Sequence, residues 1–166
     1  MIAIIIYFLQ ENFFSWFTIN GVMPNLFIIF VLFIGLFSKK VMGTAYGIGI
    51  GLILDYLVET RIGVNAILLG LVGFIAAVFD KNFSKDSRIT IMLIVAGMTI
   101  AYEVIKYLIS YAIIGTSIEI LIFSKILIIE AIYNVVISII IYPLMKKFGY
   151  AIEEEYKGNK ILTRYF

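Results

Sequence analysis

The sequence contains no cysteine and no histidine, and charged residues make up only 14% of it. A chain without these two side chains has no thiol nucleophile, no disulfide bond, no imidazole base and none of the usual ligand sets for zinc. The net charge of +2, from 13 basic and 11 acidic residues, is too small to predict a nucleic-acid-binding surface. The composition therefore predicts no cofactor, no metal site and no nucleic-acid partner.

Hydrophobic residues make up 63% of the 166 positions, and they form about six long apolar runs separated by short polar joints. A soluble domain of this length cannot bury so much apolar surface, so the runs predict helices that span a lipid bilayer. We expect an all-α, polytopic integral membrane protein with six transmembrane helices in one bundle over residues 1–145. Residues 146–166 are rich in charge and predict a short cytoplasmic tail.

The expected helices follow the apolar runs. The first run ends near Leu9 and is too short to cross a hydrocarbon core of about 30 Å unless it continues through Phe17. The remaining runs predict helices over about residues 24–37, 41–58, 63–79, 89–114 and 118–145.

Basic residues at the joints predict the orientation of the bundle. With six crossings, most of them lie on one side of the membrane, namely Lys39, Lys40, Lys81, Lys85, Arg88, Lys146 and Lys147. Only Arg61 and Lys125 lie on the other side. Cytoplasmic loops carry the excess of lysine and arginine, so we expect both termini in the cytoplasm.

Small residues recur along one face of two predicted helices. They are Gly43, Gly47 and Gly51 on the helix over 41–58, and Gly63, Ala66, Gly70, Gly73 and Ala77 on the helix over 63–79. Such faces let helix backbones approach closely in lipid, so we expect these helices to pack together or against the sixth helix. The alternative interpretation is that glycine is simply common in membrane helices.

Ionisable residues inside the predicted helices are the candidates for a functional site. Asp55, Glu103, Lys106 and Glu130 lie within apolar runs, where a charge near a helix centre costs about 2.5–3.5 kcal/mol on the insertion scale. At about 1.5 Å per residue from the cytoplasmic ends of their helices, the three acids lie at depths of about 18 to 24 Å. We therefore expect one polar cluster in the outer half of the membrane, in which Lys106 neutralises one acid.

Three further polar residues, Asn65, Tyr133 and Asn134, are expected to supply hydrogen bonds to this cluster. Two interpretations of the cluster remain open. Either the groups fix the register of neighbouring helices or reach the outer interface, or they form a ligand site or a proton pathway.

Three blocks of sequence carry a family resemblance. They are residues 20–26 (NGVMPNL), residues 47–55 (GIGIGLILD) with 63–68 (GVNAIL), and residues 130–134 (EAIYN) with 142–144 (YPL). In this order they resemble the rod shape-determining protein MreD family. Two features depart from the family pattern, because the first helix is short and Lys106 matches no family motif.

The resemblance implies a small subunit of the bacterial cell-elongation machinery in the cytoplasmic membrane. It implies as partners the bitopic membrane protein MreC and, with it, the peptidoglycan synthase pair and MreB filaments. It also implies a fold similar to the six-helix substrate-binding subunits of energy-coupling-factor vitamin transporters.

Two functions from different classes follow from these observations. The favoured one is a non-enzymatic scaffold that binds a partner helix and helps position cell-wall synthesis. The alternative is a small-molecule or lipid-binding membrane subunit, with the outer polar cluster at its pocket.

Overall fold

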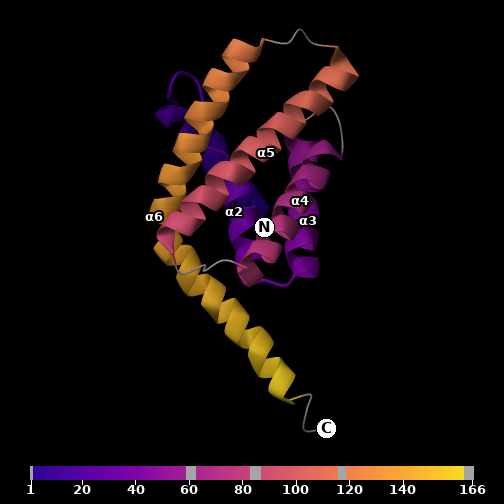
Figure 1. Cartoon of the computed structure of the whole chain (residues 1–166), viewed down its shortest axis with the longest axis vertical. Coiled ribbons are helices and arrows are strands. Elements are labelled where there is room, and N and C mark those ends of the chain that lie inside the picture. The colour runs from indigo at the N-terminus through magenta and orange to yellow at the C-terminus, as the bar shows by residue number, and fades with distance from the viewer. Residues whose placement is uncertain (1, 59–62, 83–86, 116–118, 163–166) are drawn as a thin grey trace.

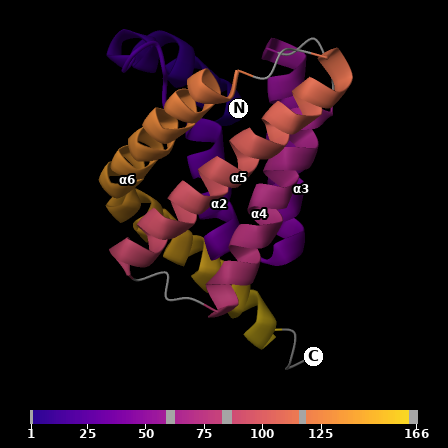
Figure 2. The same cartoon turned by 45° about the horizontal axis from the view of Figure 1, so that its top comes forward.

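The computed structural model describes residues 2–58, 63–82, 87–115 and 119–162, and all the elements named in these ranges are helices. The α-helices are α1 (Ile2–Phe8), α2 (Leu26–Phe37), α3 (Lys40–Val58), α4 (Val64–Asn82), α5 (Arg88–Ile114) and α6 (Ile120–Leu162). Figure 1 and Figure 2 show α2 to α6 packed into one bundle, and Figure 1 shows the C-terminal part of α6 projecting from its lower end. The prediction of an all-α fold is confirmed.

The helices have the length and composition of membrane-spanning segments. Within the described ranges, three segments are long and apolar enough to cross a membrane: Lys40–Val58, Arg88–Ile113 and Ile120–Tyr150. Two shorter apolar helices cover Leu26–Phe37 and Val64–Phe79. Large apolar side chains also cover the outer surface of the bundle. These features fit a helical membrane protein, because the surface that faces lipid is as apolar as the interior.

The first helical segment changes its hydrogen-bonding pattern along its length. α1 has only seven residues. It continues as the π-helix η1 (Leu9–Phe13) and the 3-10 helix η2 (Phe14–Phe17). The helical path therefore extends through Phe17, as the length of the first apolar run requires.

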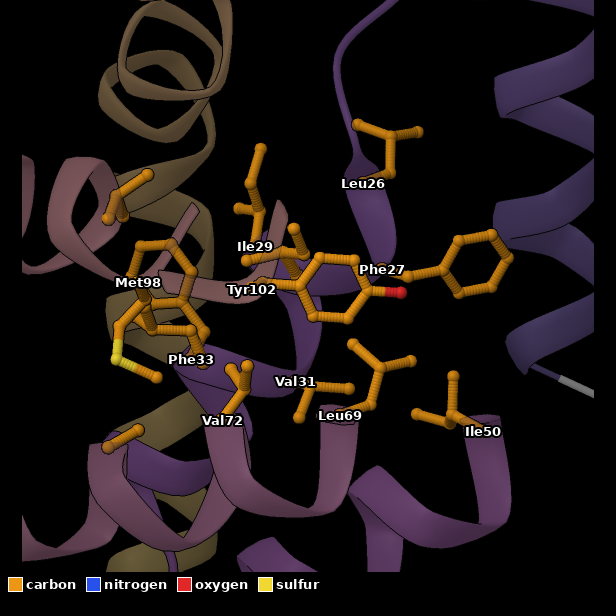
Figure 3. Packing of buried hydrophobic residues seen from close by; sticks show 14 of the residues in the cluster. Leu26, Phe27, Ile29, Val31, Phe33, Ile50, Leu69, Val72, Met98 and Tyr102 are labelled. Atoms are coloured by element: carbon orange, nitrogen blue, oxygen red, sulfur yellow. The ribbon is translucent and has the colours of Figure 1, made fainter. Parts of the chain in front are cut away.

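α2 forms the centre of the bundle. It contacts each of the other five α-helices, and its side chains are buried on all sides. Phe27, Ile28, Val31 and Leu32 are each 1% exposed or less. Figure 3 shows α2 side chains packed against residues of α3, α4 and α5, among them Tyr102. A helix that is hydrophobic all round belongs in the interior, which is where the fold places α2.

Glycines allow α3 and α4 to pack backbone to backbone, in the most extensive contact between any two helices. A Cβ atom added at Gly43, Gly47 or Gly51 of α3 would lie closer than 3.0 Å to backbone atoms of α4. On α4, Gly73 meets the backbone of α3, and Gly70 meets a side chain of α3. The spacing of these glycines in the sequence therefore corresponds to the faces that meet in the fold.

Gly63 was expected to belong to the same packing face, and the structure corrects this. It precedes α4 with a φ of +115°, and no atom lies within 4 Å of the position that its Cβ would take. This backbone conformation favours glycine, so the residue serves the turn into α4. The spacing of small residues does not reveal this. Gly63 fits the helical spacing of Ala66 and Gly70, although α4 begins only at Val64.

α6 continues past the end predicted for it near residue 145. It is a single helix of 43 residues with Pro143 in its interior. Beyond Pro143, Gly149 packs against the ring of Phe37, and the ring centroids of Phe37 and Tyr150 are 5.5 Å apart. The helix extends because the lysines and glutamates after residue 145 are good helix formers. Contacts with the bundle therefore extend into the segment expected as the tail.

We predict that Gly47→Ala lowers the free energy of unfolding by about 1–3 kcal/mol, because its methyl group meets the backbone of Leu69 and Gly70. The matched control is Gly49→Ala, since no atom lies within 4 Å of the Cβ position of Gly49. This control should be neutral or stabilising by up to about 1 kcal/mol. Thermal unfolding of both variants in detergent measures the difference, and equal losses would contradict the directed contact.

Candidate functional site

α2 and α4 begin at buried or half-buried positions, and side chains from other helices bind their first backbone N–H groups. The first four N–H groups of any helix lack partners within that helix. In a bilayer each unsatisfied group costs several kcal/mol, because no water is present to bind it. We describe the two sets of capping side chains as the α4-cap network (Asp55, Asn65 and Tyr102) and the α2-cap network (Gln10, Asn25, Thr99 and Asn134).

Asp55 of α3 is the centre of the α4-cap network. Its carboxylate accepts hydrogen bonds from the backbone N–H groups of Gly63, Asn65 and Ala66 at 2.8, 3.0 and 3.1 Å. The side chain of Asp55 is fully buried. The carboxylate thus compensates for its burial with three hydrogen bonds and with the positive end of the α4 dipole. It joins the end of α3 to the beginning of α4.

Asn65 extends this network to α5. The hydroxyl group of Tyr102 donates a hydrogen bond to Asn65 Oδ1, and both side chains are buried. Asn65 Nδ2 is also buried, and no partner for it exists among the described residues. Exchanging the two ends of the amide would leave the oxygen unpaired instead. One amide atom of Asn65 is therefore unsatisfied in either orientation.

The α2-cap network holds the beginning of the central helix. Asn134 Oδ1 of α6 accepts a hydrogen bond from the backbone N–H of Asn25 at 2.7 Å, and Asn134 Nδ2 donates to Thr99 Oγ1 of α5 at 3.0 Å. Gln10 Oε1 of η1 accepts from the backbone N–H of Leu26 at 3.0 Å. The Asn25 side chain caps its own helix by accepting from the N–H of Ile28. Three segments distant in the sequence thus converge on one helix end.

An acidic pair and a lysine lie beside the α2-cap network. Glu130 of α6 is 8% exposed. It lies within hydrogen-bonding reach of Glu103 and Asn25, and Lys106 is near enough to interact with its charge. Lys106 Nζ also lies 6.0 Å from the ring centroid of Tyr102. A cation beside two carboxyl groups reduces the cost of holding them in a medium of low dielectric constant.

The structure therefore divides the residues expected in one cluster between two places. Glu103, Lys106 and Glu130 lie together beside Asn134, whereas Asp55 and Asn65 bind the beginning of α4. Tyr102 connects the two places, because its hydroxyl group binds Asn65 and its ring lies beside Lys106. Tyr133 has a different role, because its hydroxyl group donates to the backbone oxygen of Phe17 at 2.6 Å and ties α6 to η2.

Sequence reasoning missed four members of these networks: Gln10, Asn25, Thr99 and Tyr102. Gln10 follows the first apolar run, so the sequence indicates only that a membrane segment ends there. Thr99 and Tyr102 are uncharged residues of types that are common in apolar helices, so no local signal marks them. Their positions on α5, one helical turn apart, would have suggested one polar face.

The polar groups suit helix capping better than chemistry on a metal. Among the described residues, no three His, Cys, Asp or Glu side chains are grouped so that they could hold a metal ion. The side chains of Asp55, Gln10, Asn25 and Asn134 each accept a hydrogen bond from a backbone N–H group at the beginning of a helix.

Comparison with known proteins gives one match. The family model for rod shape-determining protein MreD matches residues 1–151. No curated protein and no solved structure matches the chain.

We predict that Asp55→Ala lowers the free energy of unfolding by about 2–4 kcal/mol, because it leaves three N–H groups, two of them buried, without an acceptor. The neighbouring change Tyr56→Phe is the control, since Tyr56 is 82% exposed. Thermal unfolding in detergent measures both variants. A loss for Asp55→Ala no larger than that of the control would contradict the capping role.

A double-mutant cycle tests the division into two networks. Lys106→Met and Glu130→Gln should show a coupling of about 0.5–3 kcal/mol in the free energy of unfolding, because they belong to one group of charges. Glu130→Gln and Asp55→Asn should instead be additive within about 0.5 kcal/mol, since they share no partner. A strong coupling between Glu130 and Asp55 would contradict the division and support the single polar cluster expected from the sequence.

Proposed function

The chain belongs to the rod shape-determining protein MreD family, and on this premise we propose that it is a non-enzymatic scaffold subunit of the bacterial cell-elongation complex. It resides in the bacterial cytoplasmic membrane, binds a bitopic MreC-like protein, and helps position lateral peptidoglycan synthesis and maintain cell shape. The peptidoglycan synthase pair and MreB filaments join the complex through this partner. The family match over residues 1–151 carries the proposal.

The use of the polar groups supports a scaffold. The buried carboxylate of Asp55 and the buried amide of Asn134 each bind backbone donors of another helix. Such bonds hold helices in fixed positions, and a fixed arrangement is what a partner-binding platform requires. The backbone contact between α3 and α4 adds a second rigid element.

The proposed arrangement in the membrane has six crossings and both termini in the cytoplasm, in a fold like that of the substrate-binding subunits of energy-coupling-factor transporters. Lys39 and Lys40 precede or begin α3, and Lys146 lies near the end of the apolar part of α6. These positions support the orientation, whereas Arg61 and Lys85 lie outside the described residues. The projecting part of α6 then points to the side where MreB filaments lie.

One observation favours the alternative function, a small-molecule or lipid-binding subunit with a polar pocket in the outer half. The amide of Asn65 has an unsatisfied atom, and Tyr102, which binds this amide, lies beside Lys106. An unpaired buried polar atom calls for an explanation, and a bound ligand is one. The scaffold remains the better conclusion, because most of the other polar groups are already bound within the protein.

We predict that the chain and a bitopic MreC-like protein purify together from detergent-solubilised membranes, and that an unrelated bitopic protein does not. Glu130→Gln with Lys106→Met should preserve this association and rod-shaped growth in cells that depend on the chain, because the charges serve packing. Folding is checked by thermal unfolding of the same preparations.

If the unmodified protein does not purify with the MreC-like protein, the proposed scaffold function is wrong. If the double variant folds and binds the partner but cells lose their rod shape, the polar pocket becomes the better conclusion.

A further inference from the structure

An apolar groove lies on the face of the bundle formed by α1, α2 and α3. Its volume is about 600 Å³, and it is the larger of the two sizeable cavities described. Ala3 of α1, Phe30 and Ile34 of α2, and Ala45 and Gly49 of α3 line it. Its lining is apolar except for the hydroxyl group of Tyr46. The occupant must therefore be apolar along its length.

α3 presents small residues on two sides, and only one of these sides is filled. The side with Gly47 is occupied by the backbone of α4. The other side presents Ala45 and Gly49 to the groove, and no atom lies within 4 Å of the position that a Cβ of Gly49 would take. The floor of the groove is thus open to another molecule. It is separate from the α4-cap and α2-cap networks.

The length of the groove distinguishes between two kinds of apolar occupant. Along α3 its lining extends from Met42 to Ile53, which is about 17 Å at 1.5 Å per residue. A membrane-spanning helix needs a track of about 30 Å, whereas one leaflet of the hydrocarbon core is about half as deep. The groove therefore fits an acyl chain of one leaflet better than a partner helix.

The charge at one end of the groove indicates the headgroup. Met42 lines the groove close to the beginning of α3 at Lys40, and the exposed Lys39 precedes it. The first turn of α3 contains no acidic residue. Lys39 is exposed and stands three residues before Met42, whereas Lys40 is half-buried with its Nζ 5.6 Å from the ring centroid of Phe74 on α4, so Lys39 is the better placed of the two lysines. Basic side chains at this level attract anionic headgroups.

We propose that this groove binds an anionic phospholipid, with one acyl chain over Ala45 and Gly49 and the phosphate group beside Lys39. The lipid belongs to the leaflet at the Lys39 end of α3. This site is independent of the scaffold function, and it depends on the apolar lining and on the lysine together. The apolar lining binds the acyl chain of the lipid, and Lys39 gives the preference for a negatively charged headgroup.

Native mass spectrometry of the full chain in detergent tests the proposal, with phosphatidylglycerol and phosphatidylcholine of identical chains as probes. The unmodified protein should retain phosphatidylglycerol preferentially. Ala45→Leu fills the groove and should lower phosphatidylglycerol binding at least tenfold. Ala101→Leu is the matched control, because Ala101 is also exposed on an apolar helix but does not line this groove. It should leave binding unchanged.

A second variant tests the headgroup without altering the packing. Lys39→Gln should lower phosphatidylglycerol binding about fivefold and leave phosphatidylcholine binding unchanged, since one lysine near an anionic surface contributes about 1 kcal/mol. Thermal unfolding confirms that each variant is folded. Equal retention of the two lipids, or equal phosphatidylglycerol binding by Ala45→Leu and Ala101→Leu, would overturn the proposal. So would loss of the MreC-like partner in Ala45→Leu with lipid binding intact, which would assign the groove to a helix.

Discussion

The need to satisfy backbone N–H groups away from water determines how this bundle is held together. α2 and α4 begin at buried or half-buried positions, where the first N–H groups of a helix need acceptors from the protein. Asp55 supplies the acceptors for α4, and Asn134 with Gln10 supplies them for α2. These bonds link α3 to α4 and link both η1 and α6 to α2. The positions of the helices therefore follow from a few polar side chains, although most of the chain is apolar.

Apolar packing in a bilayer gains little from the expulsion of water, so contact area and hydrogen bonds carry more of the specificity. In this fold the close backbone contact and the hydrogen bonds between α3 and α4 lie at different places. Gly43 and Gly47 bring the backbones of α3 and α4 together along their length, while Asp55 fixes how far one helix slides along the other. The close contact sets the distance between the helices, and the polar bond sets their register. Neither would specify the arrangement alone.

Much of the fold is readable from the sequence, and much of the candidate site is not. Apolar runs predict the helices, and the spacing of Gly43, Gly47 and Gly51 predicts the face of α3 that packs. The sequence also marks Asp55 as an ionisable residue inside a helix. It does not reveal which donors Asp55 binds, because these belong to residues 63–66 and meet it only after α3 and α4 pack. The extension of α6 past residue 145 was missed because hydropathy marks membrane spans rather than helix ends.

The cap of α2 has a consequence for how the protein is made. Asn25 and its acceptor Asn134 are 109 positions apart in the chain, whereas Leu26 and Gln10 are 16 apart. Ribosomes synthesise the chain from the N-terminus, so α2 reaches the membrane long before α6 exists. During that interval the start of the central helix can be capped only by Gln10 and by the side chain of Asn25. The backbone N–H of Asn25 therefore gains its acceptor, Asn134, only when α6 inserts.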